Sequence, residues 1–424
     1  HVAAAVIGNA LEFYDFVTYA FFAVQIGHAF FPTHSAYASL MLSLGTFGAG
    51  FAMRPLGGIV LGRYADRVGR KPAMLFSFAL MGGAILAVAI IPSYSVIGIA
   101  APALVVIARM AQGFALGGEV GSSTAFLMEG AAPLERGYYA AWQGGSQYAA
   151  GLIGGIVGVV LSSVMNSADF AAYGWRIAFA LGAVTIPFGL IIRNSLPETL
   201  HLVDTAPAGT QTGSTAALLR ANARVVTLGL IVLASATIFT YVTNYMTTFA
   251  ETVLHMSDTV SFAATLTLGV CGVIGMMFGG WLSDRIGRWP VMVIPRAIYL
   301  IVVYPVYLWM VDTHSAAALL IGTAIVQLLG TISFAPFYAA LTESLPKQIR
   351  GVAFGTIYAI SIAIFGGTTQ LVITWLMHVT GSALAPALYS LGSGLFGVVA
   401  MAMLAETAPI KLAKGGQPAL ALAD

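Results

Sequence analysis

The sequence predicts an all-α membrane protein with twelve transmembrane helices in two six-helix halves. Of its 424 residues, 59% are hydrophobic and only 8% are charged, with a mean hydropathy of +0.90, whereas an average soluble domain carries roughly a quarter charged residues. Apolar runs of the roughly 20 residues that a helix needs to cross a bilayer fill nearly all of the chain. The loops of the second half also repeat those of the first.

The first six helices are delimited by charged segments and by clusters of Pro and Gly. The second ends at the charged loop GRYADRVGR, the fourth at EGAAPLERG and the sixth at RNSLPET. The predicted spans are residues 4–30, 38–61, 72–91, 97–127, 138–165 and 175–192.

The last six helices follow the same pattern. The eighth ends at the charged loop GWLSDRIGR and the tenth at ESLPKQIRG. The predicted spans are residues 222–249, 259–282, 290–311, 316–341, 352–378 and 384–404.

A polar stretch separates the two sets of helices, and we interpret it as a linker. The predicted organisation is an N-terminal half over residues 1–192, a cytoplasmic linker over 193–221, a C-terminal half over 222–404 and a cytoplasmic tail over 405–424.

The basic residues predict the orientation, because Lys and Arg are retained on the cytoplasmic side. Fourteen of the 18 fall in one set of alternate loops or in the tail, and only Arg176 falls in the opposite loops. Both termini are therefore expected in the cytoplasm. The remaining three, Arg54, Arg109 and Arg296, lie inside predicted spans.

Two loop motifs occur once in each half. The loop GRYADRVGR after the second helix is echoed by GWLSDRIGR after the eighth, and EGAAPLERG after the fourth is echoed by ESLPKQIRG after the tenth. Repeats in the same orientation indicate a pseudo-twofold axis along the membrane normal and a binding site between the halves near the midplane.

With these loops and this layout, the chain resembles the major facilitator superfamily over its whole length. The segments GNALEFYDF, FAMRPLGG, RMAQGFALGGEVG, RGYYAAWQ and GWRIAF are similar to those of the metabolite:proton symporter family, with the citrate and tricarboxylate carriers as the nearest type. GWRIAF departs from the family's GWRIPF by the loss of one proline. The resemblance implies proton-coupled transport of a small metabolite.

Two carboxylates in the first helix are candidates for proton coupling. Glu12, Asp15 and Tyr19 are spaced so that they share one helix face, and an ionisable group inside a span is costly and functional by default. Burial raises a carboxylate pKa and a nearby arginine lowers it, so such a group can gain or lose a proton as its surroundings change. The alternative is a permanent ion pair with an arginine such as Arg54.

Arg109 is the leading candidate for holding a substrate carboxylate. It lies some twelve residues, or ~18 Å, into the fourth helix, near the membrane midplane, and a guanidinium binds a carboxylate through two parallel hydrogen bonds. Gln112 on the same helix is a further substrate contact, and Glu119 is a third candidate for proton coupling. A fixed ion pair of Arg109 with Glu119 or Asp15 is the alternative.

Two further arginines lie inside spans. For Arg54, substrate capture and pairing with a neighbouring helix are both open. Arg296 lies on the ninth helix, which the resemblance places in the outer ring, and this favours a structural or snorkelling role.

Neutral polar side chains supply the rest of the predicted site. These residues are also suited to ordinary helix packing through interhelical hydrogen bonds. They are Tyr241, Asn244 and Tyr245 on the seventh helix, Gln143, Ser146 and Gln147 on the fifth, Thr331 and Ser333 on the tenth and Tyr358 on the eleventh.

The resemblance also implies gating residues in the repeated loops. Asp66 and Arg70 in one half, with Asp284 and Arg288 in the other, are expected to form charge and helix-end contacts. These contacts would stabilise the outward-open arrangement and break when the cytoplasmic side opens.

The sequence thus favours a proton-coupled symporter of a di- or tricarboxylate in a bacterial inner membrane, functional as a monomer within the lipid bilayer. No cofactor, metal site or nucleic-acid partner is predicted, and the single cysteine, Cys271, excludes an intramolecular disulfide. The alternatives are a carrier of a zwitterion such as betaine or proline, an exporter of hydrophobic compounds and a transporter-like sensor. An intramembrane enzyme is disfavoured because the hydrolase motifs H-E-x-x-H and G-x-S-x-G are absent.

Overall fold

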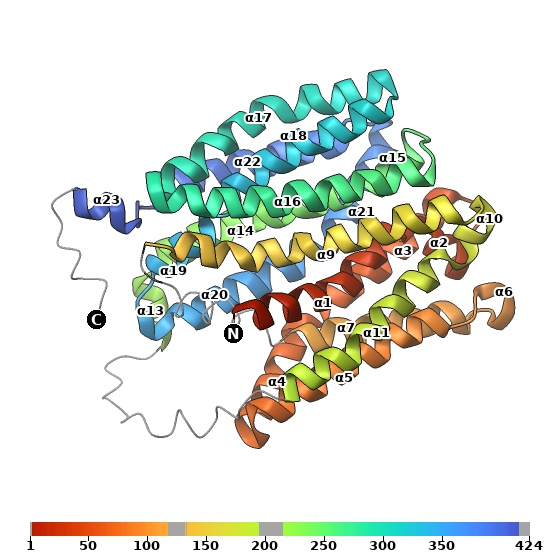
Figure 1. The fold of residues 1–424 in the computed structure, drawn as a ribbon, viewed down its shortest axis with the longest axis horizontal. Helices are drawn as coiled ribbons and strands as arrows, with labels where there is room; N and C mark the ends of the chain where they lie inside the picture. Colours follow the sequence, from red (N-terminus) through yellow and green to blue (C-terminus); the bar gives the residue numbers. More distant parts are fainter. Residues whose placement is uncertain (1, 118–131, 133, 195–214, 415–424) are drawn as a thin grey trace.

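The computed structural model describes residues 2–117, 132, 134–194 and 215–414. Within these ranges the regular secondary structure is helical and contains no strand. Most helices are long and run roughly side by side along the longest axis of the molecule (Figure 1). Eight helical segments of the described chain are long and apolar enough to cross a membrane.

The helices of the first half begin and end close to the predicted bounds. They are α1 (Val2–Phe21), α2 (Ala23–Phe30), α3 (Ala36–Ala52), α4 (Arg54–Val68), α5 (Arg70–Ile90), α6 (Tyr94–Ile97), α7 (Ala100–Leu116), α9 (Arg136–Val164), α10 (Ser167–Asp169), the π-helical turn η1 (Phe170–Gly174) and α11 (Trp175–Asn194).

The second half is built in the same way. Its helices are α13 (Thr215–Ala221), α14 (Ala223–Asn244), α15 (Met246–Thr252), α16 (Asp258–Ile286), α17 (Arg288–Thr313), α18 (Ala316–Phe334), α19 (Phe337–Glu343), α20 (Lys347–Ser361), the π-helical turn η2 (Ile362–Gly366), α21 (Gly367–Thr380), α22 (Ala385–Met403) and α23 (Pro409–Lys414).

Wherever the structure describes them, the twelve predicted spans are mainly helical, but several are interrupted; the fourth span is described only as far as residue 117. The second span breaks into α3 and α4 at Met53, and the tenth into α18 and α19 at Ala335–Pro336. A proline lies at each break, Pro55 in the first turn of α4 and Pro336 at the N-cap of α19, and a proline cannot donate the backbone hydrogen bond that would continue the preceding helix. Such breaks inside the bundle expose backbone groups and redirect side chains.

The two halves meet most closely along α9 and α16, which lie side by side across the centre of Figure 1. Glycines allow this approach. A Cβ on Gly155 would lie 2.6 Å from the Leu266 nitrogen, and one on Gly269 would lie 2.4 Å from the Leu152 Cα. Any larger residue would force these helices apart.

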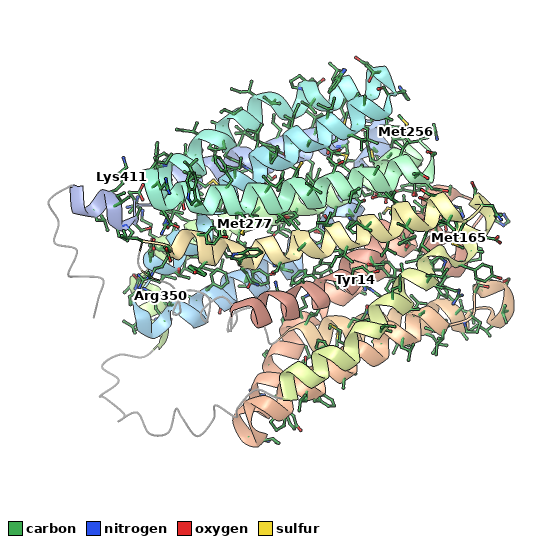
Figure 2. The ribbon with its side chains drawn as sticks, in the orientation of Figure 1. Tyr14, Met165, Met256, Met277, Arg350 and Lys411 are labelled. Carbon is green, nitrogen blue, oxygen red and sulfur yellow. The ribbon has the colours of Figure 1, made fainter. Side chains whose placement is uncertain are left out.

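The two ends of the bundle differ in charge. Arg350 and Lys411 mark one end in Figure 2, which also carries the turns after α4 and α16 with their arginines, and we call it the basic end. Met165 and Met256 mark the opposite end. Between the ends, large apolar side chains such as Ile301 and Phe396 point outward, which is typical of a lipid-facing surface.

Candidate functional site

Two buried arginines of the first half lie together in a cluster of aromatic rings. Arg109 of α7 is fully buried and Arg54, the first residue of α4, is 6% exposed. The Phe16 ring lies between them, with its centroid 4.5 Å from the Arg54 Cζ and 4.6 Å from the Arg109 Cζ. Tyr19 covers Arg109 at 4.5 Å and Phe51 covers Arg54 at 4.4 Å. Ring faces attract cations, but they neutralise no charge.

Arg54 and Gln112 have buried hydrogen-bond donors available to a ligand. Arg109 Nη1 donates to Gln112 Oε1, one turn further along α7. Among the described residues, Arg54 Nε and Nη2 and Gln112 Nε2 are buried and have no hydrogen-bond partner. A buried donor without an acceptor is costly, and more so when it is charged. The arrangement therefore suits an anionic ligand.

The second half contributes tyrosines that face Arg54. The Tyr241 ring of α14 packs edge-on against Phe51, with 5.3 Å between centroids. The hydroxyls of Tyr241 and Tyr358 both interact electrostatically with Arg54. Gln147 Nε2 of α9 donates to the Tyr358 hydroxyl at 3.4 Å, so this residue of α20 also contacts the first half.

We refer to Arg54, Arg109, Gln112, Tyr241 and Tyr358 as the arginine site. It lies between the halves and combines two guanidinium forks with two hydroxyls. This is the donor set that binds a small molecule carrying more than one carboxylate.

The contacts of the three predicted proton-coupling acids are not described by the structure. Glu119 and the side chains of Glu12 and Asp15 lie outside the described residues. The backbone of α1 nevertheless passes the arginine site at Phe16 and Tyr19, the turn that follows Asp15. Their role in proton transfer stays a prediction.

Several residues predicted for the site use their described polar groups in helix packing. Asn9, which the sequence reasoning missed, donates to the Gln143 carbonyl at 3.3 Å and to the Ser146 hydroxyl at 2.6 Å, joining α1 to α9. Thr331 donates to the Gln327 carbonyl within α18, and Ser333 donates to the Met292 carbonyl on α17 at 2.8 Å. These contacts do not involve either arginine.

Tyr241 and Tyr245 lie four residues apart in the sequence, but the structure gives them different surroundings. The Tyr245 hydroxyl accepts from Thr374 Oγ1 at 2.9 Å and lines a cavity of about 380 Å³ toward the opposite end. Asn244, the last residue of α14, is buried between them. The interruption of the helix at Tyr245 explains the divergence, because it changes the direction of the side chains that follow.

The halves also touch at the opposite end. The Tyr37 ring of α3 stacks on His378 of α21, with 3.8 Å between centroids. Gln25 of α2 donates to Glu251 of α15 at 3.2 Å. We refer to these two contacts as the outer gate. His28 and His378 are exposed at this end. Further along α3, beside Phe51, a Cβ on Gly48 would lie 2.6 Å from the Gly367 carbonyl oxygen, so the halves also approach each other next to the arginine site.

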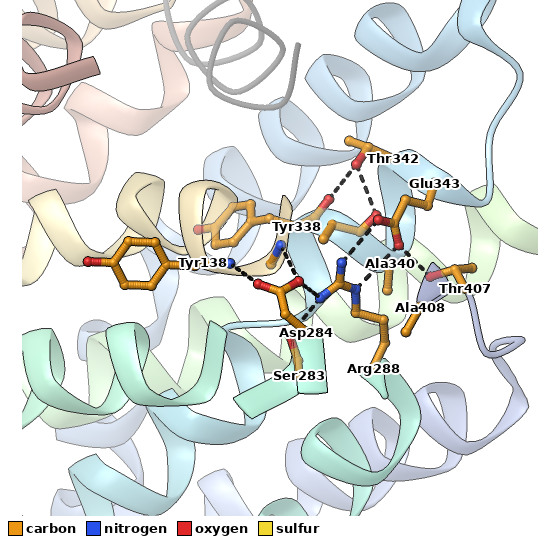
Figure 3. A network of polar contacts seen from close by, with 12 residues as sticks. Tyr138, Ser283, Asp284, Arg288, Tyr338, Ala340, Thr342, Glu343, Thr407 and Ala408 are labelled. Atoms are coloured by element: carbon orange, nitrogen blue, oxygen red, sulfur yellow. Dashed lines mark hydrogen bonds and ion pairs between the residues drawn. The ribbon is translucent and has the colours of Figure 1, made fainter. Parts of the chain in front are cut away.

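Arg288 lies in a different environment at the basic end (Figure 3). Its guanidinium contacts Asp284 at 2.5 Å and Glu343 at 3.1 Å, and it donates to Ser283 at 2.8 Å. Thr407, after α22, donates to the same Glu343 carboxylate. We refer to these five residues as the Arg288 cluster.

The Arg288 cluster reaches across to the first half. The Asp284 carboxylate accepts from the backbone nitrogens of Gly137 and Tyr138, both at 2.9 Å, at the start of α9. A carboxylate at a helix N-terminus is stabilised by the unpaired amides and the helix dipole. The expected helix-end contact is therefore present in this loop, whereas the side chains of Asp66 and Arg70 lie outside the described residues.

Arg296 does not snorkel to a membrane surface, so that part of the expectation was wrong. It is 2% exposed inside the second half, where Nη2 donates to the Ser235 hydroxyl at 2.7 Å and the Tyr299 ring lies 4.8 Å away. Its position near Gly394 and Gly397 joins α17 to α14 and α22. The structural alternative fits these contacts.

The chain is similar in sequence to known transport proteins. The sequence pattern of the Major Facilitator Superfamily matches residues 5–364. The chain is 37% identical to the citrate-proton symporter of Salmonella typhi, over 94% of this chain and 92% of that protein. It is 34% identical to the alpha-ketoglutarate permease of Escherichia coli K12, over 88% and 85% of the two chains.

The chain is also similar to a less closely related transporter and to a solved structure. The proline/betaine transporter of Escherichia coli K12 is 28% identical over 99% of this chain and 85% of that protein. Among solved structures, a D-xylose-proton symporter superimposes with a TM-score of 0.77 over 96% of this chain and 98% of that chain, at 17% identity. The fold, including the two-half layout, is therefore shared with proton-coupled carriers.

Proposed function

Since this chain belongs to the major facilitator superfamily and is a transporter, we propose that it carries a citrate-like di- or tricarboxylate together with protons. The observation that supports this substrate class best is Arg54, whose buried Nε and Nη2 have no hydrogen-bond partner among the described residues. Two relatives with 34% identity or more are named for citrate and for alpha-ketoglutarate, both of which are carboxylates.

In this proposal the arginine site holds the anion between the halves. Arg54 and Arg109 each bind one carboxylate, and the hydroxyls of Tyr241 and Tyr358 donate to the same ligand from the second half. Binding would then draw the two halves together, because one ligand contacts residues of both. Alternating access follows if each half rocks about the site as a rigid body.

Protons make uptake of a multivalent anion favourable. With the cytoplasm negative, each net negative charge carried inward works against ~2.3 kcal/mol per 100 mV, so the protons must more than neutralise the substrate for the potential to assist. We propose Asp15, Glu12 and Glu119 as groups that carry them.

The proposal places the protein in a bacterial inner membrane as a monomer surrounded by lipid, with the predicted halves and linker as its domains. The basic end faces the cytoplasm with both termini, and the opposite end faces the periplasm, because Lys and Arg are retained inside. The outer gate is then periplasmic, and the Arg288 cluster is cytoplasmic and opens when substrate is released.

A zwitterion carrier is the alternative that the site disfavours. A quaternary ammonium group is recognised by the faces of aromatic rings. The faces of Phe16, Tyr19 and Phe51 are already covered by Arg54 and Arg109, and these cations would repel a second positive charge.

Uptake into proteoliposomes with an imposed pH gradient tests the proposal. The panel is citrate, tricarballylate, 2-oxoglutarate, succinate and betaine, with Arg109→Ala and Asp15→Asn as variants. We expect saturable, gradient-driven uptake of a carboxylate that Arg109→Ala abolishes and that Asp15→Asn uncouples from protons. Uptake of betaine alone would overturn the substrate class, and active accumulation by Asp15→Asn would overturn that residue's role.

A further inference from the structure

Glu251 is a carboxylate in the outer gate, and it has no role in the transport cycle proposed above. It lies on α15, beyond the end of the apolar span Ala223–Asn244. Its Oε1 accepts from Nε2 of Gln25, which belongs to α2 in the other half and is 6% exposed. This contact therefore forms only while the periplasmic ends of the two halves are together.

The second polar atom of Gln25 shows which form of Glu251 fits the contact. Gln25 Oε1 is buried and has no hydrogen-bond donor among the described residues. An ionised carboxylate offers only acceptors, whereas a protonated one offers an O–H donor. An acid and an amide side chain can then exchange two hydrogen bonds. If the Gln25 amide were rotated by half a turn, its oxygen would face the Glu251 carboxylate oxygen. Both atoms are acceptors, so Glu251 would again have to carry a proton.

The charges around Glu251 act in the same direction. Asp258, at the start of α16, is the one described ionisable group whose charge acts on it, and no described cation does. Burial and this neighbouring carboxylate together raise the pKa of Glu251 to about 8, although the hydrogen bond from Gln25 lowers it. Other titratable side chains on the surrounding elements include His28 on α2, His255 in the turn after α15 and Tyr307 on α17.

A route for protons lies beside this contact. The cavity of about 380 Å³ is lined by Val24 and Thr252, the chain neighbours of Gln25 and Glu251, and by exposed His28 and His378. Water that enters this cavity would bring periplasmic protons close to Glu251.

We propose that Glu251 is a further proton-binding residue of this carrier, which takes up a periplasmic proton and must hold it for the outer gate to close on Gln25. Closure is thereby linked to protonation, so the carrier cannot leave the outward-open state without a proton. The link to transport rests on the proposed function, while the gate movement can be measured without any substrate.

The sign of the pH dependence follows from linkage. In the open gate Glu251 is hydrated, with an ordinary pKa of ~4.3, and in the closed gate its pKa is about 8. The closed state therefore binds the proton more tightly. The equilibrium constant for closing the gate is therefore highest below the lower pKa. It falls by up to about tenfold per pH unit between the two pKa values and is constant above the higher one.

Distance measurements between spin labels test this directly. Labels on exposed His34, before α3, and exposed Val379, on α21, report the gate in a Cys271→Ser background without touching its contacts. In the unmodified gate, we expect the short-distance population at pH 5.5 to give way to a longer one by pH 9. Glu251→Gln, which copies the protonated acid, should keep the short distance at both pH values.

Two further variants separate the role of Glu251 from the roles of its neighbours Asp258 and Gln25. Asp258→Asn leaves the titrating group in place and should retain a pH response. Gln25→Met removes the partner amide and should shift the opening transition to lower pH, which covers the case in which Glu251→Gln does not fold. A Glu251→Gln protein with the unmodified pH response would overturn the proposal. Failure of citrate uptake with an intact pH response would instead count against the proposed substrate.

Discussion

Arg54 and Arg288 each begin a helix and are each buried, yet their surroundings are opposite. Arg288 is held by two carboxylates, Asp284 and Glu343, and by the Ser283 hydroxyl. Arg54 lies between the rings of Phe16 and Phe51, and its Nε and Nη2 have no hydrogen-bond partner among the described residues.

The difference separates a structural cation from a cation that can bind a ligand. Removing one member of a buried ion pair leaves an uncompensated charge and costs stability, so the Arg288 cluster acts as a contact between helices. No carboxylate among the described residues balances the charge of Arg54, and such a cation gains most when an anion arrives. Arg54 should therefore affect binding and Arg288 should affect stability and gating.

The largest expected effect is on stability, from Arg288→Gln. Because the Glu343 and Asp284 carboxylates lose their cation, we expect the free energy of unfolding to fall by about 3–5 kcal/mol, with little change in the Kd for citrate. Unfolding in detergent and calorimetric titration measure the two quantities. Arg285→Gln, an exposed arginine stacked on Trp281, is the matched control and should cost below about 1 kcal/mol. A large loss of citrate affinity in Arg288→Gln would remove the distinction.

The Arg288 cluster also shows how much the sequence could predict. The repeated loop motif identified Asp284 and Arg288, because their spacing is local and recurs in both halves. Glu343 and Thr407 join them only in three dimensions, since they come from α19 and from the segment after α22. Apolar runs likewise predicted the twelve spans, but they do not reveal the breaks at Met53 and Ala335, which lie beside Pro55 and Pro336.

A smaller effect is expected from Gly48→Ala, which tests the approach of the two halves beside the arginine site. The added methyl would meet the Gly367 carbonyl at 2.6 Å, and such crowding costs about 1–3 kcal/mol. Uptake should fall about fivefold or more, because the halves can no longer approach each other next to the site. Gly45→Ala, on the same helix with open space at its Cβ, should transport normally. Equal uptake by both variants would show that α3 and α21 need not approach.

The smallest effect is expected from Tyr241→Phe. Losing one hydrogen bond to a bound carboxylate should weaken citrate about fivefold, or ~1 kcal/mol, as measured by calorimetric titration. Tyr245→Phe is the matched control because that hydroxyl already accepts from Thr374. If Tyr245→Phe weakens citrate more than Tyr241→Phe does, the site extends into the outer cavity.

For the arginine site, the sequence predicted which residues take part better than it predicted which groups they contact. Arg54, Arg109 and Tyr19 stood out as polar groups within apolar spans, and the structure brings them together with Gln112 and Tyr241. Single-helix spacing could not reveal that Thr331, Ser333 and Tyr245 use their hydroxyls elsewhere. Glu251 was also missed, because its meaning depends on Gln25, 226 residues away in the sequence.

The most direct test of the central claim is the Kd for citrate of Arg54→Gln beside that of Arg296→Gln, measured by calorimetric titration of the purified protein. Both variants remove a buried arginine, but Arg296 is bound to Ser235 inside the second half. Truncating one partner of a buried charge pair costs about 2–5 kcal/mol, so Arg54→Gln should weaken citrate at least about 30-fold, while Arg296→Gln leaves its Kd nearly unchanged. Equal affinities in the two variants, or a loss confined to Arg296→Gln, would contradict the assignment of the arginine site.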